Sequence, residues 1–114
     1  MTRTLLWGAE DYSIEAYYEE PIPSHNLNDN LSNYDMICIV VSSSIDIQSN
    51  IVNNIWFDTG ICFDTNKKVD FWIYLQRYMH IAFSNNAFEI TGAGRGWENP
   101  GYIPIIYKIY GYKW

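Results

Sequence analysis

Two histidines, His25 and His80, are the side chains best suited to acid–base or nucleophilic chemistry. A Ser-His-Asp or Cys-His arrangement joins groups that meet in space rather than in sequence, so distance along the chain does not exclude one. However, no Gly-x-Ser-x-Gly elbow is present to support such an arrangement. His80 falls inside a predicted strand, and we expect it to be a structural imidazole.

Carboxylates offer a second kind of chemistry. Asp58, Asp64 and Asp70 lie in a central stretch, and two carboxylates about 5–10 Å apart could form a glycosidase. A chain with 13 acidic residues always contains such pairs, so this signal carries little weight. The pattern Asp64-x-Asn66 with Asp70 is similar to a calcium loop but lacks the EF-hand spacing and its glycine. We predict no catalytic residue, no metal site and no cofactor.

Glycine recurs at every second position in Gly92-x-Gly94-x-Gly96. A dinucleotide loop needs a further glycine and a following helix whose N-terminus faces the phosphates, and neither is present. We expect residues 92–101 to form a loop between strands, in which Arg95 and Trp97 contact a partner.

Aromatic side chains are the strongest compositional signal, at 18% of residues with 10 Tyr, 5 Trp and 5 Phe. Each buries roughly 150–250 Å², so a small core would struggle to hold them all, and Tyr and Trp are enriched at interfaces. The alternative is that strands favour aromatic residues in any case. We expect the ligand-binding residues to be Trp56, Trp72, Tyr74, Arg95, Trp97 and Tyr102, with Trp114 as a further aromatic to test.

Short apolar segments separated by turn residues must position these side chains. The run Met36-Ile-Cys-Ile-Val-Val41 predicts a strand buried on both faces, whereas Pro21 and Pro23 are expected to break the chain. Ser84–Ala87 reads as the tight turn of a hairpin. The pattern predicts an antiparallel β-sandwich or jelly roll of about 7–9 short strands. The predicted strands cover residues 3–7, 12–18, 25–27, 34–41, 55–57, 69–75, 78–83, 88–91 and 103–112, of which 34–41 is the clearest.

Length and charge limit the remaining classes. A chain of 114 residues fits one domain, here residues 1–114. A net charge of −6 argues against a protein that binds along nucleic-acid phosphates.

The two cysteines, Cys38 and Cys62, are too few for a disulfide scaffold, and we expect Cys38 to be a buried free thiol rather than bridged. No apolar stretch approaches the roughly 20 residues of a membrane span, and the N-terminus lacks the features of a signal peptide.

Three segments carry a family resemblance. The chain opens with Thr4-Leu-Leu-Trp7 before a glycine, continues through Leu27-Asn-Asp-Asn-Leu-Ser-Asn-Tyr-Asp-Met-Ile37, and closes with Ile105-Ile-Tyr-Lys-Ile-Tyr-Gly-Tyr-Lys113. It resembles the small β-domains at the distal ends of bacteriophage tail fibres and related minor tail proteins. Residues 45–100 match these domains only in their rhythm of strands and turns.

The resemblance implies a β-sandwich head, usually a homotrimer, that a virion displays to contact a bacterial surface. We therefore expect a tail receptor-binding module that contacts a surface glycan or protein, assembled in the host cytoplasm and located on the virion. The resemblance carries over no catalytic residue. The segment at residues 12–23 is longer and more acidic than the turn that we expect from the family. The sequence starts at Met1 with no fibre stalk, so we expect either an excised head or a stand-alone virion protein. The second option favours the alternative of a virion structural or decoration protein. A small polysaccharide hydrolase is a weaker alternative.

Overall fold

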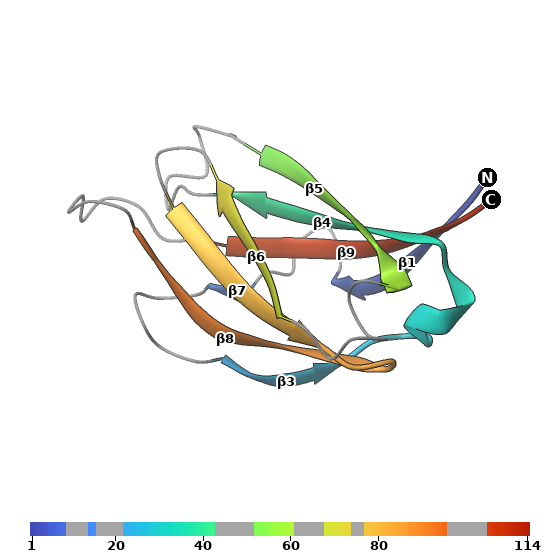
Figure 1. Ribbon diagram of the computed structural model, residues 1–114, viewed down its shortest axis with the longest axis horizontal. Helices are drawn as coiled ribbons and strands as arrows, with labels where there is room; N and C mark the ends of the chain where they lie inside the picture. Colours follow the sequence, from blue (N-terminus) through green and yellow to red (C-terminus); the bar gives the residue numbers. More distant parts are fainter. Residues whose placement is uncertain (9–13, 16–21, 43–51, 61–67, 74–76, 96–104) are drawn as a thin grey trace.

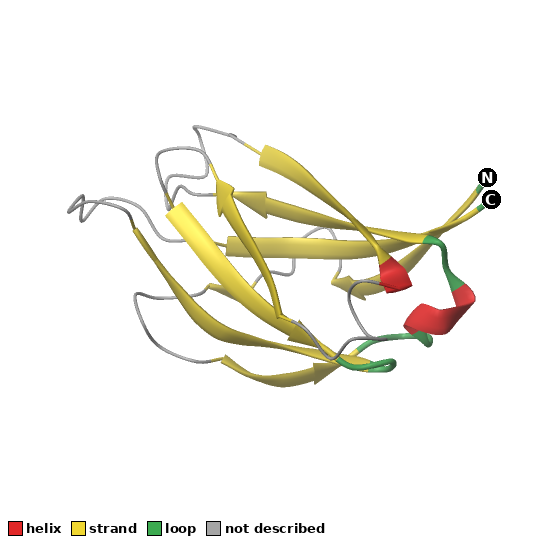
Figure 2. Cartoon of the chain, viewed as in Figure 1, coloured by secondary structure: helices red, strands yellow, loops and turns green. Residues whose placement is uncertain are grey.

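The described part of the protein forms two antiparallel sheets stacked face to face (Figures 1 and 2). The computed structural model describes residues 1–8, 14–15, 22–42, 52–60, 68–73, 77–95 and 105–114. These residues confirm the expected antiparallel all-β sandwich. The first sheet contains β1 (Thr2–Gly8), β2 (Ile14–Glu15), β4 (Met36–Ser42), β5 (Val52–Asp58) and β9 (Ile105–Lys113). The second sheet contains β3 (Ile22–Asn26), β6 (Lys68–Ile73), β7 (Arg77–Phe83) and β8 (Ala87–Arg95).

The last strand, β9, lies at the centre of the first sheet, whose order is β1-β9-β4-β5. One side of β9 pairs with β4. The other side pairs first with β2, at Ile105 and Ile106, and then with β1 up to Lys113. The two N-terminal strands therefore share one edge of the sheet, and both chain ends emerge side by side at the same end of the sandwich (Figure 1).

The second sheet has the order β3-β8-β7-β6, so β6, β7 and β8 follow one another as a meander. The predicted hairpin is confirmed: Phe83 pairs with Phe88, and the Ser84 backbone N–H donates to the Ala87 carbonyl at 2.9 Å. A tight turn at Asn85 and Asn86 is typical of such a hairpin, because Asn accepts turn conformations readily.

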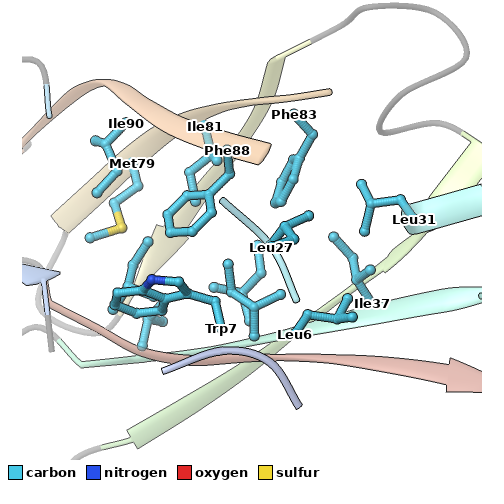
Figure 3. Packing of buried hydrophobic residues seen from close by; sticks show 14 residues of the cluster. Leu6, Trp7, Leu27, Leu31, Ile37, Met79, Ile81, Phe83, Phe88 and Ile90 are labelled. Carbon is cyan, nitrogen blue, oxygen red and sulfur yellow. The ribbon is translucent and has the colours of Figure 1, made fainter. Parts of the chain in front are cut away.

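The core lies between the sheets and draws side chains from both. Met79, Ile81 and Phe88 of the second sheet point toward Leu6 and Ile37 of the first (Figure 3). As predicted, β4 is buried along most of its length, because Ile37, Ile39 and Val41 face this core while Cys38 is covered on the other face. Apolar burial of this kind contributes about 25 cal/mol per Å² and is the main term that holds the sandwich together.

Two register shifts in the first sheet change the alternation expected from sequence. The shift between Leu5 and Trp7 lets two consecutive residues, Leu6 and Trp7, enter the core. A second shift between Val40 and Val41 puts Ile106 in the core together with Ile109. A strict period of two through β9 would put Ile106 and Ile109 on opposite faces of the sheet. A β-bulge is the reason that this period fails, since one extra residue reverses the facing of the next.

Two further expectations for the second sheet were wrong. Residues 92–95 belong to β8 rather than to a loop, and Gly92 and Gly94 pair with His80 and Tyr78. Pro23 does not break the chain but lies inside β3, at a register shift between Ile22 and His25. An edge strand accepts proline at a bulge, because the missing N–H is not needed by the ladder there.

The end of the sandwich that carries both termini is held by the three segments of the sequence resemblance. The Asn28 backbone N–H donates to the Leu6 carbonyl at 2.7 Å, and the Asp35 N–H donates to the Tyr112 carbonyl at 2.8 Å. The Tyr34 ring packs on Gly111, where a Cβ atom would lie 2.7 Å from the ring. Gly8 has a φ of +97° and lies against the backbone of Tyr107, a conformation that glycine adopts at low cost. These motif residues therefore act structurally.

A short 3-10 turn, η1 (Leu31–Asn33), completes this end and docks on the β7–β8 hairpin. The Leu31 backbone N–H donates to the Asn85 carbonyl at 2.7 Å, and the Ser32 N–H donates to the Asn85 side-chain oxygen at 2.8 Å. The hairpin turn of the second sheet is thereby tied to the segment that leads into β4 of the first.

Candidate binding site on the five-stranded sheet

The six residues predicted to bind a ligand do not form one cluster. Trp56 lies on β5 in the first sheet, whereas Trp72 and Arg95 lie on β6 and β8 in the second. In the second sheet these two strands are separated by β7, and the register places both residues at the end remote from the chain termini (Figure 1). Tyr74, Trp97 and Tyr102 lie outside the described residues.

Trp56 belongs to a group of aromatic residues on the outer face of the five-stranded sheet. Along β9, Tyr110 and Tyr112 alternate with core-facing residues, and the register places Tyr110 opposite Cys38, which in turn is opposite Trp56. On the other side of β9, Arg3 is opposite Tyr112. We refer to Arg3, Trp56, Tyr110 and Tyr112 as the aromatic face.

The ring of Trp56 reaches across β4 to the ring of Tyr112, with the two centroids 4.8 Å apart and the planes at 49°. This separation is within the range of favourable aromatic pairs, which add about 0.5–1.5 kcal/mol beyond the area they bury. Trp56 remains 47% exposed, whereas Tyr112 is only 9% exposed. The exposed ring of Trp56 is therefore held in place by the buried ring of Tyr112.

Cys38 lies in β4 beneath this layer of rings and is only 2% exposed although it faces away from the core. It is a free thiol, as expected. Burial raises the pKa of the Cys38 thiol, because the thiolate would lose its hydration there. Cys38 therefore acts as a small apolar residue that supports the rings above it.

Charged and polar groups surround the rings. The Arg3 guanidinium lies over the Tyr110 ring, 4.6 Å from its centroid, which is within the range of a cation–π contact. Asn54 and Asp58, on the same outer face of β5 as Trp56, are exposed. Flat apolar surface with hydrogen-bonding groups at its margin suits recognition of a sugar ring or of a protein side chain.

The two histidines do not approach each other. His25 stacks on Phe88 with centroids 5.8 Å apart, and its Nδ1 lies 2.7 Å from the Pro23 carbonyl oxygen. His80 lies on β7 between the core-facing residues Met79 and Ile81, so it faces the opposite side of the second sheet. The structural role expected for His80 stays a prediction.

Carboxylates are likewise scattered. A shallow pocket on the outer face of the second sheet contains one acidic residue, Glu89, among small side chains such as Ser24 and Ala82. Asp58 lies in the other sheet, Asp70 lies on β6, and Asp64 is outside the described residues. Within the described part of the chain, no three His, Cys, Asp or Glu residues are placed to hold a metal ion.

Comparison with known protein families and with curated proteins finds no match to this chain. Among the described residues, no helix has the length and hydropathy needed to cross a membrane.

Sequence reasoning missed three members of the aromatic face because it singled out tryptophans and loops. Tyr110 and Tyr112 are separated by one residue at the end of an apolar strand, and this period of two was the signal that could have found them. No sequence pattern indicates Arg3, because it reaches Tyr110 only through the pairing of the first and last strands.

Proposed function

We propose that this chain is the receptor-binding module of a bacteriophage tail fibre or baseplate, and that it binds a bacterial surface glycan through the aromatic face. Two arguments support the proposal: the resemblance of its three motif segments to tail-fibre heads, and the partly exposed Trp56 ring beside Tyr112. The second observation carries it. Binding rather than catalysis is the role that we assign to this surface.

The chemistry of the aromatic face favours a sugar. Pyranose rings carry one face of C–H groups that packs on an indole, while their hydroxyls need hydrogen-bond partners at the margin of the ring. Asn54 and Asp58 offer an amide and a carboxylate beside Trp56, and Arg3 offers donors beside Tyr110. A fixed aromatic surface also loses little side-chain entropy on binding, because the Tyr112 ring already packs against Trp56.

An array of bacterial capsule, lipopolysaccharide and teichoic-acid glycans, probed with the purified chain, tests this proposal. The substitution Trp56→Ala is expected to weaken binding to any glycan hit by about tenfold or more, as is usual for a central aromatic contact. Trp56→Phe keeps a flat ring and should retain part of the affinity. Glu89→Ala, an exposed change on the opposite sheet, serves as the control and should bind as the native chain does. Undiminished binding by Trp56→Ala would contradict the proposal.

A second function has one observation in its favour. A receptor-binding head would carry its contacting aromatics at the end of the domain away from the termini, but Arg3 and Tyr112 lie within a few residues of the two chain ends. Such a position suits the alternative of a virion protein that contacts other tail proteins next to its point of attachment. This alternative predicts that tail particles lacking this chain take up the Trp56→Ala variant less well than they take up the native chain. It also predicts that no glycan on the array binds in a way that depends on Trp56.

Two expectations remain part of this proposal. The resemblance implies a homotrimer on a fibre axis, and it implies that the chain is located on the virion after assembly in the host cytoplasm. Light scattering on the purified chain measures its mass in solution, and a trimer that stays intact in Trp56→Ala would assign trimer formation to a different surface.

A further inference from the structure

We propose that the ligand of the aromatic face is an acidic glycan, bound with its anionic group at Arg3 and with a neutral sugar ring on Trp56. This inference rests on the proposed function. It adds the chemical class of the glycan and the direction in which the glycan crosses the five-stranded sheet. It follows from one row of the sheet that has opposite charges at its two margins.

This row runs across four strands, from Arg3 on β1 to Asp58 on β5. Arg3 is opposite Tyr112 on β9. Tyr112 is opposite Met36 on β4, and Met36 is in turn opposite Asp58. Residues directly opposite each other face the same side of a sheet, so both charged residues lie on the outer face. Neighbouring strands are about 4.7–4.9 Å apart, and the backbones at the two ends of the row are therefore about 14 Å apart.

The basic end of the row is held in place by an aromatic ring. The Arg3 side chain is exposed, and its guanidinium lies 4.6 Å from the centroid of the Tyr110 ring. Contact of a guanidinium with a ring face uses none of its five N–H donors, which remain able to bind a ligand. Carboxylates and phosphates are the groups that arginine binds best, because two parallel N–H donors match two oxygens. An anionic group on the ligand is therefore favoured at this margin.

The acidic end of the row has the opposite preference. Asp58 is exposed, and its Oδ1 accepts the Gly60 backbone N–H at 2.8 Å, which fixes the carboxylate in place. An ionised carboxylate only accepts hydrogen bonds, so it suits the hydroxyl or amide donors of a sugar. A second anion beside it would be repelled. The ligand should therefore be neutral at this margin.

The aromatic pair determines which part of the ligand must be neutral. Trp56 lies two residues from Asp58 on the same face of β5, and its ring contacts Tyr112 toward the middle of the sheet. A sugar ring that packs on Trp56 therefore lies beside the Asp58 carboxylate. Its acidic neighbour along the glycan then lies nearer to Arg3. The ligand that fits both margins is an oligosaccharide in which an acidic unit adjoins a neutral one.

The two charges act on the ligand separately. Their separation of about 14 Å exceeds the Debye length of about 8 Å at physiological ionic strength. The chain as a whole has a net charge of −6, but distant charges are screened in the same way. The local contact with Arg3 should therefore decide whether an acidic glycan binds.

A paired glycan array tests the class of ligand. Each acidic capsule oligosaccharide is printed beside its carboxyl-reduced form, and each teichoic-acid oligomer beside its phosphate-free sugar. We expect Trp56-dependent binding to be about tenfold weaker for the neutral member of a pair, as is usual for loss of a charge-assisted hydrogen bond. The pairs that show this difference distinguish a carboxylate from a phosphate as the anionic group.

Variants of Arg3 assign the difference to one side chain. Arg3→Gln should lower binding of the acidic member to the level of the neutral member and leave the neutral member unchanged. Arg3→Lys keeps the charge without the planar fork and should retain part of the difference. Lys113→Gln is the matched control, because it makes the same change in charge next to Tyr112 but on the other face of β9, where Nζ lies 3.4 Å from the Asn33 carbonyl oxygen. Thermal unfolding confirms that each variant is folded.

Asp58→Asn tests the direction of binding. It keeps the Oδ1 that accepts the Gly60 N–H and removes only the charge. Oligosaccharides with an acid on every ring should bind this variant about threefold more tightly than they bind the native chain, whereas those that alternate acidic and neutral rings should not gain. Equal gains for the two kinds of oligosaccharide, or no gain for either, would overturn the proposed direction.

The array separates failure of this inference from failure of the proposed function. Trp56-dependent binding to neutral glycans alone would overturn the inference and leave the proposed function standing. The same holds for an acidic glycan whose binding changes neither on carboxyl reduction or phosphate removal nor with Arg3→Gln. An array on which no glycan binds through Trp56 would overturn both.

Discussion

Trp56 and Tyr112 touch across an intervening strand, with ring centroids 4.8 Å apart although β4 separates β5 from β9. The two rings therefore form a bridge over β4 at the level of Cys38 and Met36, which are the residues opposite them in the register. This contact explains how a cysteine on the outer face of a sheet can be 2% exposed. It also couples the exposed ring of the candidate site to the last strand of the fold.

Removing the Trp56 ring should uncover the Cys38 thiol. In a Cys62→Ser background, Trp56→Ala is expected to increase the rate at which a disulfide reagent modifies the native protein, and to lower the free energy of unfolding by about 1 kcal/mol through loss of the aromatic pair. Reaction kinetics followed by absorbance check this. Glu89→Ala in the same background is the control, and equal thiol rates in the two variants would show that Trp56 does not cover Cys38.

Gly111 should tolerate no side chain, because a Cβ atom there would lie 2.7 Å from the Tyr34 ring and 3.0 Å from Leu6. Gly111→Ala is expected to lower the free energy of unfolding by about 1–3 kcal/mol, as overpacking of a core usually does. Gly92→Ala is the matched control, since its nearest contact is the His80 ring at 3.2 Å. Denaturant unfolding measures both, and an equal loss for the two would argue against close packing of Tyr34 on Gly111.

Thr59 joins the end of β5 to the entry of β4. It is 4% exposed, and its hydroxyl lies 2.5 Å from the Tyr34 carbonyl oxygen and 3.2 Å from that of Asp35. Thr59→Val keeps the shape but removes the donor, and we expect a loss of about 1–3 kcal/mol because a carbonyl is left without its partner. Thr59→Ser retains the hydroxyl and should lose less. Chemical unfolding measures both variants. If Thr59→Ser is less stable than Thr59→Val, the methyl group of Thr59 contributes more to stability than its hydrogen bond does.

The ionised Asp29 carboxylate should raise the free energy of unfolding at neutral pH, and this contribution should be lost in acid. The Tyr34 hydroxyl donates to one carboxylate oxygen at 2.7 Å, and the Asn30 backbone N–H and Asn33 amide donate to the other. These bonds hold the pKa of Asp29 below its ordinary value of 3.8, with the Tyr34 contact as the largest cause. A carboxyl whose pKa is lower in the folded state stabilises the fold above its unfolded pKa, and that contribution is lost as the pH falls through the folded pKa.

Carbon-detected NMR titration of the Asp29 carboxyl measures this shift directly. In Tyr34→Phe the pKa of Asp29 should move back toward 3.8, and stability should depend less on pH below about 4. Asn33→Ala removes a weaker contact and should produce a smaller change. A titration curve unaltered by Tyr34→Phe would mean that a different group sets the pKa of Asp29.

Local sequence patterns were sufficient to predict most of the fold. Alternation and turn residues indicated β1, β4, the β7–β8 hairpin and an all-β architecture, because each of these signals is complete within about ten residues. The bulges at Leu5/Trp7 and Val40/Val41 were not predicted. Each bulge depends on how two strands that are distant in sequence align, and the local sequence does not show a register shift of one residue.

The candidate site was predicted only in part, for a similar reason. Exposed tryptophan was a sound expectation for Trp56, but the residues around it come from both ends of the chain. Tyr112 and Arg3 are neighbours because β1 pairs with β9, and strand order is not encoded in any local pattern. The Gly92–Arg95 stretch was misread as a loop because glycine is depleted in strands, whereas here Gly92 leaves room for the His80 ring.

The pairing of β1 with β9 also determines how the domain responds to mechanical load. Thr2 lies opposite Lys113, so the two ends of the chain are next to each other and point the same way. A force that pulls the two termini apart would break the β1–β9 hydrogen bonds one pair at a time, so the force needed to separate the two strands would be low. Trp56 is level with Tyr110, only three residues along the strands from Lys113, and β5 is two strands from β9. A force between the paired termini and Trp56 would instead cross β9, β4 and β5, so that the backbone hydrogen bonds of both ladders would carry it. A pull on both ends together, against a hold on Trp56, would therefore leave the β1–β9 pair closed and would load the β9–β4 and β4–β5 pairs instead.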